Sequence, residues 1–208
     1  MKFYDCTPAP SPRRARIFIA EKGIEVETVQ VDLGSGEHLG PDFRALNPQC
    51  TVPVLELDDG TVITENAGIA AFLEAEYPEP PLLGRTPVEK GLVAMWNARV
   101  EFEGLTSVAE ALRNSAKGFA GRALAGPENY EQIPELAERG RIRAARFLDM
   151  LNERLEGREF VATDAFSMAD ITAMVVVDFA KWLKLPESER PHLRRWHEAV
   201  SARPSATA

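Results

Sequence analysis

The stretch NPQCTVPVLELDDGTVITENAGIAAFLE, residues 47–74, decides the fold of this chain. Two short apolar runs, 54–57 and 61–64, flank an Asp-Gly pair, which supplies the residue types that a tight hairpin needs for positive φ angles. Apolar residues at helical spacing follow at 69–73, and Thr64 is the expected N-cap of that helix. The stretch therefore predicts a β-hairpin followed by a helix.

The residues before this hairpin predict a strand, a helix and a second strand. A short strand is expected at 2–5, a helix over about 12–22 closed by Gly23, and a strand over 25–33, where apolar and polar residues alternate. Together with the hairpin and its helix, this order predicts a small mixed sheet covered by helices.

The second half of the chain predicts helices only. One long helix is expected over about 88–117, and a second over about 131–155. Ser167 and Asp170 form a capping-box variant before the apolar run 169–177, which is typical of a helix buried at the centre of a bundle.

Successive prolines in 77–81 separate these two sections, because proline removes backbone donors and biases the preceding residues away from helix. We predict a first domain of residues 1–80, a linker at 81–87 and an all-helical domain of residues 88–208. At 208 residues, with 45% hydrophobic and 27% charged residues, the chain is long enough for two small cores.

The charge and cysteine content limits the classes of function. A net charge of −8 and a pI near 5.1 give no broad attraction for nucleic acid or anionic lipid. The local basic clusters at 13–16 and 141–146 read as solvated helix faces. Cys6 and Cys50 match neither a CxxC pair nor a zinc site, so free thiols are expected, with one disulfide left open. Without a secretory signal at the N-terminus, we expect a cytoplasmic protein with no metal, nucleic-acid or membrane partner.

Two features of the opening stretch suggest a ligand site. Proline cannot donate to a sheet ladder, so Pro53 predicts either a sheet edge or a cis Val52–Pro53 bond, which would turn the Val52 amide and carbonyl outward toward an extended peptide. Glu65 and Asn66 lie in the first turn of the next helix, where free N–H groups favour an anion. The carboxylate and ammonium of an α-amino acid would fit there. Each feature alone also fits a purely structural role.

Several motifs of this chain occur together in one known family. In the first half they are Gly36-Glu37-His38, Pro41-x-Phe43, Asn47-Pro48-Gln49, Thr51-Val52-Pro53-Val54-Leu55, Asp59-Gly60 and Glu65-Asn66. In the second half they are Phe166-Ser167-x-Ala169-Asp170 and Ala202-Arg203-Pro204-Ser205. This set resembles the soluble glutathione transferase family, especially its delta/theta-like and bacterial members. The resemblance covers the whole chain and implies an α/β, thioredoxin-like first domain followed by an all-α domain.

The resemblance implies that glutathione is the ligand of the first domain. Pro53 would be the cis-proline, the Val52 backbone would pair with the cysteinyl portion of glutathione, and Glu65 with Asn66 would hold its γ-glutamyl end. Asn66 replaces the serine that is usual in the family, but its amide groups remain, so we expect binding to survive.

Two further positions concern the glycyl end of glutathione. His38 resembles a family histidine near the glycyl carboxylate, although a solvated loop histidine fits the sequence as well. Cys50 stands where some relatives carry a histidine, which removes one cationic partner. The resemblance thus implies weaker anchoring of the glycyl end, or a thiol near the ligand.

Transfer chemistry needs a donor to the glutathione sulfur, because the thiolate is the nucleophile. Ser11 is the predicted catalytic residue, since members of the family carry serine, cysteine or tyrosine near the start of the first helix. A serine followed by Pro12 also fits a simple N-cap. Cys6, Thr7 and Tyr4 are weaker alternatives, and Cys6 would imply mixed-disulfide chemistry.

The resemblance predicts a homodimeric glutathione transferase of detoxification, which conjugates glutathione to a small hydrophobic electrophile bound between the domains. One helix offers apolar residues for that pocket, although core packing fits them too: Trp96, Phe102, Leu105 and Val108. Two other functions stay open. They are a non-catalytic interaction protein of the same fold, and a glutathione-dependent thiol reductase or isomerase that uses Cys6.

Overall fold

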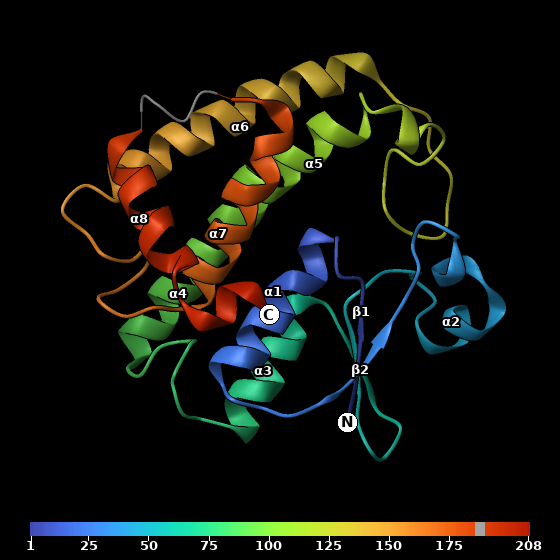
Figure 1. Cartoon of the computed structure of the whole chain (residues 1–208), viewed down its shortest axis with the longest axis horizontal. Coiled ribbons are helices and arrows are strands. Elements are labelled where there is room, and N and C mark those ends of the chain that lie inside the picture. The colour runs from blue at the N-terminus through green and yellow to red at the C-terminus, as the bar shows by residue number, and fades with distance from the viewer. Residues whose placement is uncertain (186–189) are drawn as a thin grey trace.

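A small mixed sheet forms one end of the molecule and a bundle of helices the other (Figure 1). The computed structural model describes residues 1–185 and 190–208. The strands are β1 (Lys2–Asp5), β2 (Glu27–Gln30), β3 (Val54–Glu56) and β4 (Val62–Thr64), in the order β2-β1-β3-β4. β1 is parallel to β2 and antiparallel to β3, which pairs antiparallel with β4. The predicted mixed sheet and the 54–64 hairpin are confirmed.

Helices cover the sheet on both sides. α1 (Pro10–Glu21) and α3 (Asn66–Glu76) lie between the sheet and the bundle, while α2 (Pro41–Leu46) lies at the far side of the sheet (Figure 1). The sequence did not predict α2 or the single 3-10 turn Glu37–Leu39 before it. Six residues are too few for a helical repeat of apolar positions to stand out.

The start of α3 differs from the prediction. Its N-cap is Glu65, not Thr64, because Thr64 is the last residue of β4 and pairs with Val54. Glu65 has φ 65° and ψ 139°, and its side chain makes no capping hydrogen bond. The chain therefore turns sharply from strand into helix at an acidic residue.

Helices dominate the bundle, and its described residues contain one isolated β-bridge, between Arg122 and Tyr130. The helical segments are α4 (Pro87–Arg99), a π-helical turn (Val100–Leu105), α5 (Thr106–Arg113), α6 (Pro134–Arg154), α7 (Met168–Ala180) and α8 (Pro191–Ser201). Short 3-10 turns follow at Lys117–Phe119, Lys181–Leu183 and Pro204–Thr207. The single helix predicted over 88–117 is thus interrupted by the π-helical turn and ends at Arg113. None of the helices among the described residues is both long and apolar enough to cross a bilayer.

The bundle core is built around α7, which is buried almost all round as predicted. Its capping box of Ser167 and Asp170 is confirmed. α5 and α6 approach each other closely at Gly140, where an added Cβ would lie 2.6 Å from the main-chain nitrogen of Ala111. The fold class, a thioredoxin-like part followed by a helical part, is therefore confirmed. The domain boundaries at residues 80 and 88 remain a prediction.

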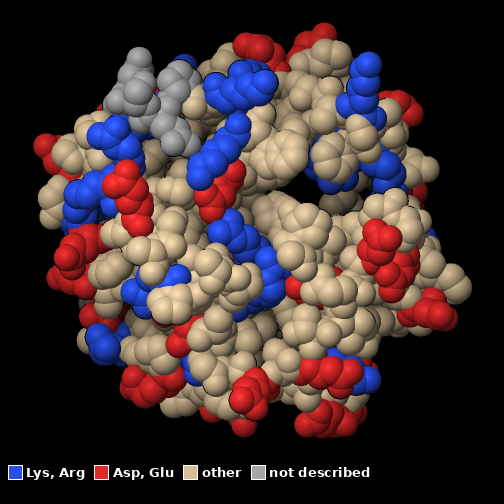
Figure 2. Space-filling view, in the orientation of Figure 1, with Lys and Arg blue, Asp and Glu red and all other residues tan. Residues whose placement is uncertain are grey.

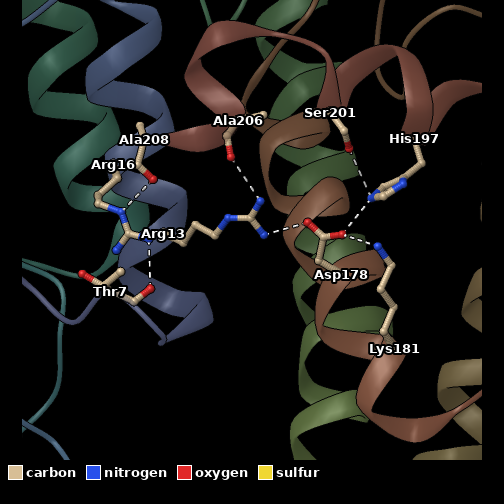
Figure 3. Close-up of polar contacts among 9 residues, drawn as sticks. All are labelled: Thr7, Arg13, Arg16, Asp178, Lys181, His197, Ser201, Ala206 and Ala208. Atoms are coloured by element: carbon tan, nitrogen blue, oxygen red, sulfur yellow. Dashed lines mark hydrogen bonds and ion pairs between the residues drawn. The ribbon is translucent and has the colours of Figure 1, made fainter.

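Polar contacts join α1 to the bundle and to the C-terminal residues (Figure 3). Arg13 forms an ion pair of 2.7 Å with Asp178 of α7 and donates to the carbonyl of Ala206. Asp178 also accepts from Lys181 and His197, each at 2.9 Å. Burial acts to raise the pKa of Asp178, but the hydrogen bonds from these three residues outweigh it and hold the pKa below its ordinary value. These contacts therefore tie α1 to the second half of the chain.

Candidate functional site

Ser11 and Asn66 meet at the N-terminal end of α1, although they are far apart in sequence. The Ser11 hydroxyl oxygen accepts one hydrogen bond from Asn66 Nδ2 at 3.1 Å and another from Arg14 Nη2 at 3.2 Å. A hydroxyl has two lone pairs and one hydrogen. Because both lone pairs are occupied, the hydrogen of Ser11 remains available to donate to a further group.

Ser11 does not cap α1. The helix begins at Pro10, one position earlier, and its N-cap is Ala9, which has no side chain able to cap. Ser11 therefore lies in the first turn, where the main-chain N–H groups have no partner inside the helix and the positive end of the helix dipole favours negative charge.

Arg14 is a buried cation next to Ser11. Its side chain is paired with Glu101 from the π-helical turn, and its residue exposure is only 5%. Burial lowers the pKa of Arg14 and Glu101 opposes that change, while its Nε has no partner within residues 1–185 and 190–208. The solvated-face interpretation of the 13–16 cluster is wrong, because Arg14 pairs with Glu101 as Arg13 does with Asp178.

Next to Pro53, the main chain of Val52 is left available to pair with another molecule. The Val52–Pro53 peptide bond is cis, and β3 begins only at Val54. Among the described residues, neither the N–H nor the C=O of Val52 is hydrogen-bonded to another residue. The Val52 side chain packs into a small apolar cluster with Cys6 and Phe43. These groups offer an extended peptide one donor and one acceptor.

The start of α3 adds the carboxylate of Glu65 and the side-chain amide of Asn66 to the region around Ser11. Glu65 is exposed, and Asn66, the first residue of the helix, is 3% exposed. Asn66 Nδ2 donates to Ser11, but its Oδ1 has no hydrogen-bond partner in the part of the chain that the structure describes. A buried amide oxygen of this kind is costly unless a ligand or water satisfies it.

Cys50 and His38, the two residues predicted to lie near the glycyl end of glutathione, differ in their burial and in their contacts. Cys50 is 1% exposed at φ 52°, and its Sγ lies 3.6 Å from the carbonyl oxygen of Pro48. His38 is partly buried, and its Nδ1 has no partner within the described ranges. Burial, followed by the charges of Arg122 and Arg113, lowers the pKa of His38. Burial and the two arginine charges thus all disfavour the protonated ring, and the sequence did not single out either arginine.

Both cysteines are free and buried. Cys6 is 7% exposed and packs among apolar side chains. A thiol in such surroundings is typically inert, because reactive cysteines sit in partly exposed, electropositive sites. The geometry therefore gives no support to disulfide chemistry at Cys6.

The apolar helix residues predicted to line a substrate pocket lie in different surroundings. Trp96 and Val108 belong to the main core, whereas Phe102 is 69% exposed. The core-packing alternative is the correct one for the first two. Figure 2 shows a hollow between the sheet end and the bundle, with Lys and Arg side chains on its rim. No group of three His, Cys, Asp or Glu side chains among the described residues could hold a metal ion.

Comparisons with known proteins identify the family of this chain. The model of the glutathione S-transferase N-terminal domain matches residues 9–76, and that of the C-terminal domain matches residues 119–204. Glutathione S-transferase 2 of Saccharomyces cerevisiae is 40% identical over 209 residues, which cover 99% of this chain and 87% of that protein.

Two further relatives extend the match. A crystal structure of a glutathione S-transferase domain-containing protein from Marinobacter aquaeolei VT8 is 39% identical, with a TM-score of 0.90 and 99% of both chains covered. The maleylacetoacetate isomerase of Pseudomonas aeruginosa is 38% identical over 101 residues, 46% of this chain and 48% of that protein. With both domain models matched and near full-length relatives of this identity, the chain belongs to the glutathione S-transferase family.

Proposed function

We propose that this chain is a glutathione transferase, which binds glutathione along the segment before Pro53 and activates its sulfur as a thiolate. The observation that carries the proposal is the hydroxyl of Ser11, whose oxygen accepts from Asn66 and Arg14 so that its hydrogen is left for the sulfur. Two donors on the oxygen also polarise the O–H bond, which makes it a stronger hydrogen-bond donor.

The bound tripeptide would run antiparallel to Val52, whose N–H and C=O would pair with the cysteinyl residue. Its γ-glutamyl carboxylate would sit at the N-terminus of α3, and its ammonium would pair with the exposed carboxylate of Glu65. This orientation directs the cysteinyl sulfur toward the first turn of α1.

The reaction begins when the thiol of glutathione loses its proton to solvent. The resulting thiolate accepts a hydrogen bond from Ser11, in the field of the α1 dipole and of the buried charge of Arg14, and all three favour the anion. The sulfur then donates an electron pair to an electrophilic carbon. A carbon–sulfur bond forms, and a leaving group such as chloride departs with the electrons of its broken bond.

The substitution Ser11→Ala tests this proposal. We expect kcat for a chlorinated aromatic electrophile to fall by about 10²–10³, the usual loss when one donor to a developing anion is removed. The pKa of the bound glutathione thiol, followed by thiolate absorbance, should rise, while the dissociation constant of glutathione should change little.

Thr7→Ala is the matched control. Thr7 also carries a hydroxyl near the start of α1, but that hydroxyl donates to Gln30 at 2.9 Å. Its removal should leave both kcat and the thiol pKa unchanged. If Thr7→Ala lost activity and Ser11→Ala did not, the assignment of Ser11 would be refuted. Retention of the wild-type protein on immobilised glutathione without any turnover would instead support the non-catalytic interaction protein.

The proposal extends to the cellular location and the oligomeric state that the family resemblance implies. We expect a cytoplasmic homodimer that works without a metal ion, on a small hydrophobic electrophile. Sedimentation of the purified protein, and activity that survives exhaustive chelation, would test the assembly and metal parts separately.

A further inference from the structure

Glu101 connects the helical bundle to the first turn of α1. It lies in the π-helical turn Val100–Leu105, and its carboxylate accepts from Nη1 of Arg14. Nη2 of the same guanidinium donates to the Ser11 hydroxyl at 3.2 Å. Two consecutive contacts therefore lead from the bundle to the residue that we place at the glutathione sulfur.

The π-helical turn that carries Glu101 is fixed by contacts within the bundle. Thr106 Oγ1 donates to the main-chain carbonyl of Glu101 at 2.9 Å. Gly104 packs so closely on α6 that an added Cβ would lie 2.6 Å from the ring of Phe147. Helical turns of the π type are rare and occur frequently at functional sites. The Glu101 carboxylate is therefore presented to α1 from a backbone whose position the bundle determines.

Arg14 depends on Glu101 for its position. Only 6% of the Arg14 side chain is exposed, and within residues 1–185 and 190–208 its hydrogen bonds go to Glu101 and Ser11 alone. Removing one partner of a buried ion pair leaves an uncompensated charge, which is strongly unfavourable. A long arginine side chain avoids that state by turning its charged end toward water. Without the Glu101 carboxylate, the guanidinium would therefore leave the Ser11 hydroxyl.

The sign of the effect on the glutathione thiol separates positioning from simple electrostatics. Glu101 is an anion, so removal of its charge alone would lower the pKa of a nearby thiol. Release of Arg14 acts in the opposite direction, because the Ser11 hydroxyl and the sulfur both lose the cation that favours the thiolate. A rise in the thiol pKa is therefore the signature of lost positioning.

We propose that Glu101 is a positioning residue, which acts through Arg14 to hold the Ser11 hydroxyl at the glutathione sulfur. The proposal rests on the proposed function, because Ser11 is the donor to the thiolate in that reaction. It goes further by giving the helical bundle a part in the activation of glutathione, a step that the proposed function places in the first half of the chain.

Glu101→Ala tests the proposal. We expect the pKa of the bound glutathione thiol, followed by thiolate absorbance, to rise by about one unit, the effect of losing one charge-assisted hydrogen bond. At a pH below both pKa values, kcat for a chlorinated aromatic electrophile should fall about tenfold, and it should recover above the raised pKa. A merely structural role of Glu101 would lower the free energy of unfolding but leave the thiol pKa unchanged, and that result would overturn the proposal.

Two further variants of Glu101 keep the test informative if the alanine variant does not fold. Glu101→Gln retains an oxygen that can accept from Arg14, so its kcat should stay within about threefold of the wild type and the thiol pKa should not rise. Glu101→Asp withdraws the carboxylate by one methylene, so the thiol pKa should rise. A rise in the glutamine variant without a rise in the aspartate variant would contradict the proposal.

Two acidic residues serve as matched controls. Glu103 is an exposed glutamate of the same π-helical turn, so Glu103→Ala should leave the thiol pKa unchanged. Asp178 also forms an ion pair from the bundle to α1, but with Arg13, which makes no printed contact with Ser11 in the described residues. Asp178→Ala should not raise the thiol pKa. A rise equal to that of Glu101→Ala would mean that the docking of α1 on the bundle governs activation, and the role of Glu101 would be refuted.

The Ser11→Ala background separates this inference from the proposed function. Once the hydroxyl is absent, Glu101→Ala should raise the thiol pKa by much less than in the wild-type background, because residues that act as a unit are not additive. An equal rise in both backgrounds would show that Glu101 does not act through Ser11. If Ser11→Ala lowers kcat and Glu101→Ala leaves the thiol pKa unchanged, only this inference fails. If Ser11→Ala changes neither quantity, the proposed function fails with it.

Discussion

The helices α3 and α7 both have an acidic residue at their start, Glu65 as the N-cap of α3 and Asp170 in the first turn of α7, but the two starts are built in opposite ways. At α7, Asp170 is fully buried and accepts from Ser167 N–H and Oγ, from Val161 N–H and from the indole of Trp196, at 2.8–3.2 Å. Burial raises the pKa of Asp170 to about 6, although these four donors act against that rise. At α3, Glu65 is exposed, caps nothing and has a positive φ.

The contrast separates a helix start whose acidic side chain is used inside the protein from one whose acidic side chain is left free, as the proposed glutathione site requires. In α7 every oxygen of the carboxylate is used inside the protein, so nothing is left for another molecule. In α3 the Glu65 carboxylate, the Asn66 Oδ1 and the first-turn N–H groups are all uncommitted in the described structure. Backbone strain at such a place is typical of functional sites. The following predictions test whether this contrast holds.

The largest effect is expected from Asp170→Ala. The substitution leaves four buried donors without an acceptor, which typically costs about 3–5 kcal/mol for a buried charged network. The free energy of unfolding, measured with urea, should fall by that amount. Asp164→Ala, at an exposed aspartate in the loop before the same helix, should change it by less than about 0.5 kcal/mol. A loss below about 1 kcal/mol for Asp170→Ala would show that the buried acid is not the main support of α7.

The sequence predicted most of the fold because its signals are local. The Asp-Gly pair, the proline run and the Ser167 and Asp170 spacing each act within a few residues, and the hairpin and the capping box were found where expected. The boundaries were less accurate. The N-cap moved from Thr64 to Glu65, and the long helix was interrupted by a π-helical turn, because neighbouring elements decide both.

Some residues of the candidate site could be predicted from the sequence, but the contacts between them could not. Ser11 and Asn66 were singled out separately, but their hydrogen bond depends on how α1 and α3 pack, which no local pattern encodes. Arg14, which contacts Ser11, was missed for the same reason. Whether an arginine is solvated or buried depends on partners that are far away in sequence. The only sequence signal for Arg14 was its place one turn after Ser11.

A smaller effect, on binding alone, is expected from Glu65→Gln. The change keeps the shape of the side chain but removes the charge that would pair with the glutathione ammonium. The dissociation constant of glutathione, measured by calorimetry, should rise about 10- to 100-fold, the usual range for a lost charged hydrogen bond. The free energy of unfolding should change by less than about 0.5 kcal/mol, because the side chain is exposed.

Glu76→Gln is the control for this change, since Glu76 is an exposed glutamate at the other end of α3. It should alter neither quantity. Equal weakening of glutathione binding in both variants would mean that general charge on α3, rather than the ion pair with Glu65, governs affinity.

The smallest effect, and one of opposite sign, is expected from Glu65→Gly. Glycine adopts φ 65° and ψ 139° without the steric cost that Glu65 bears, and only part of that gain is offset by the greater freedom of glycine in the unfolded chain. The free energy of unfolding should rise by about 0.5–1 kcal/mol while glutathione binding weakens. Lys184→Gly, at another exposed residue with positive φ, should not alter binding. A stability loss in Glu65→Gly would mean that Glu65 supports its helix as Asp170 does, and the two helix starts would no longer differ in kind.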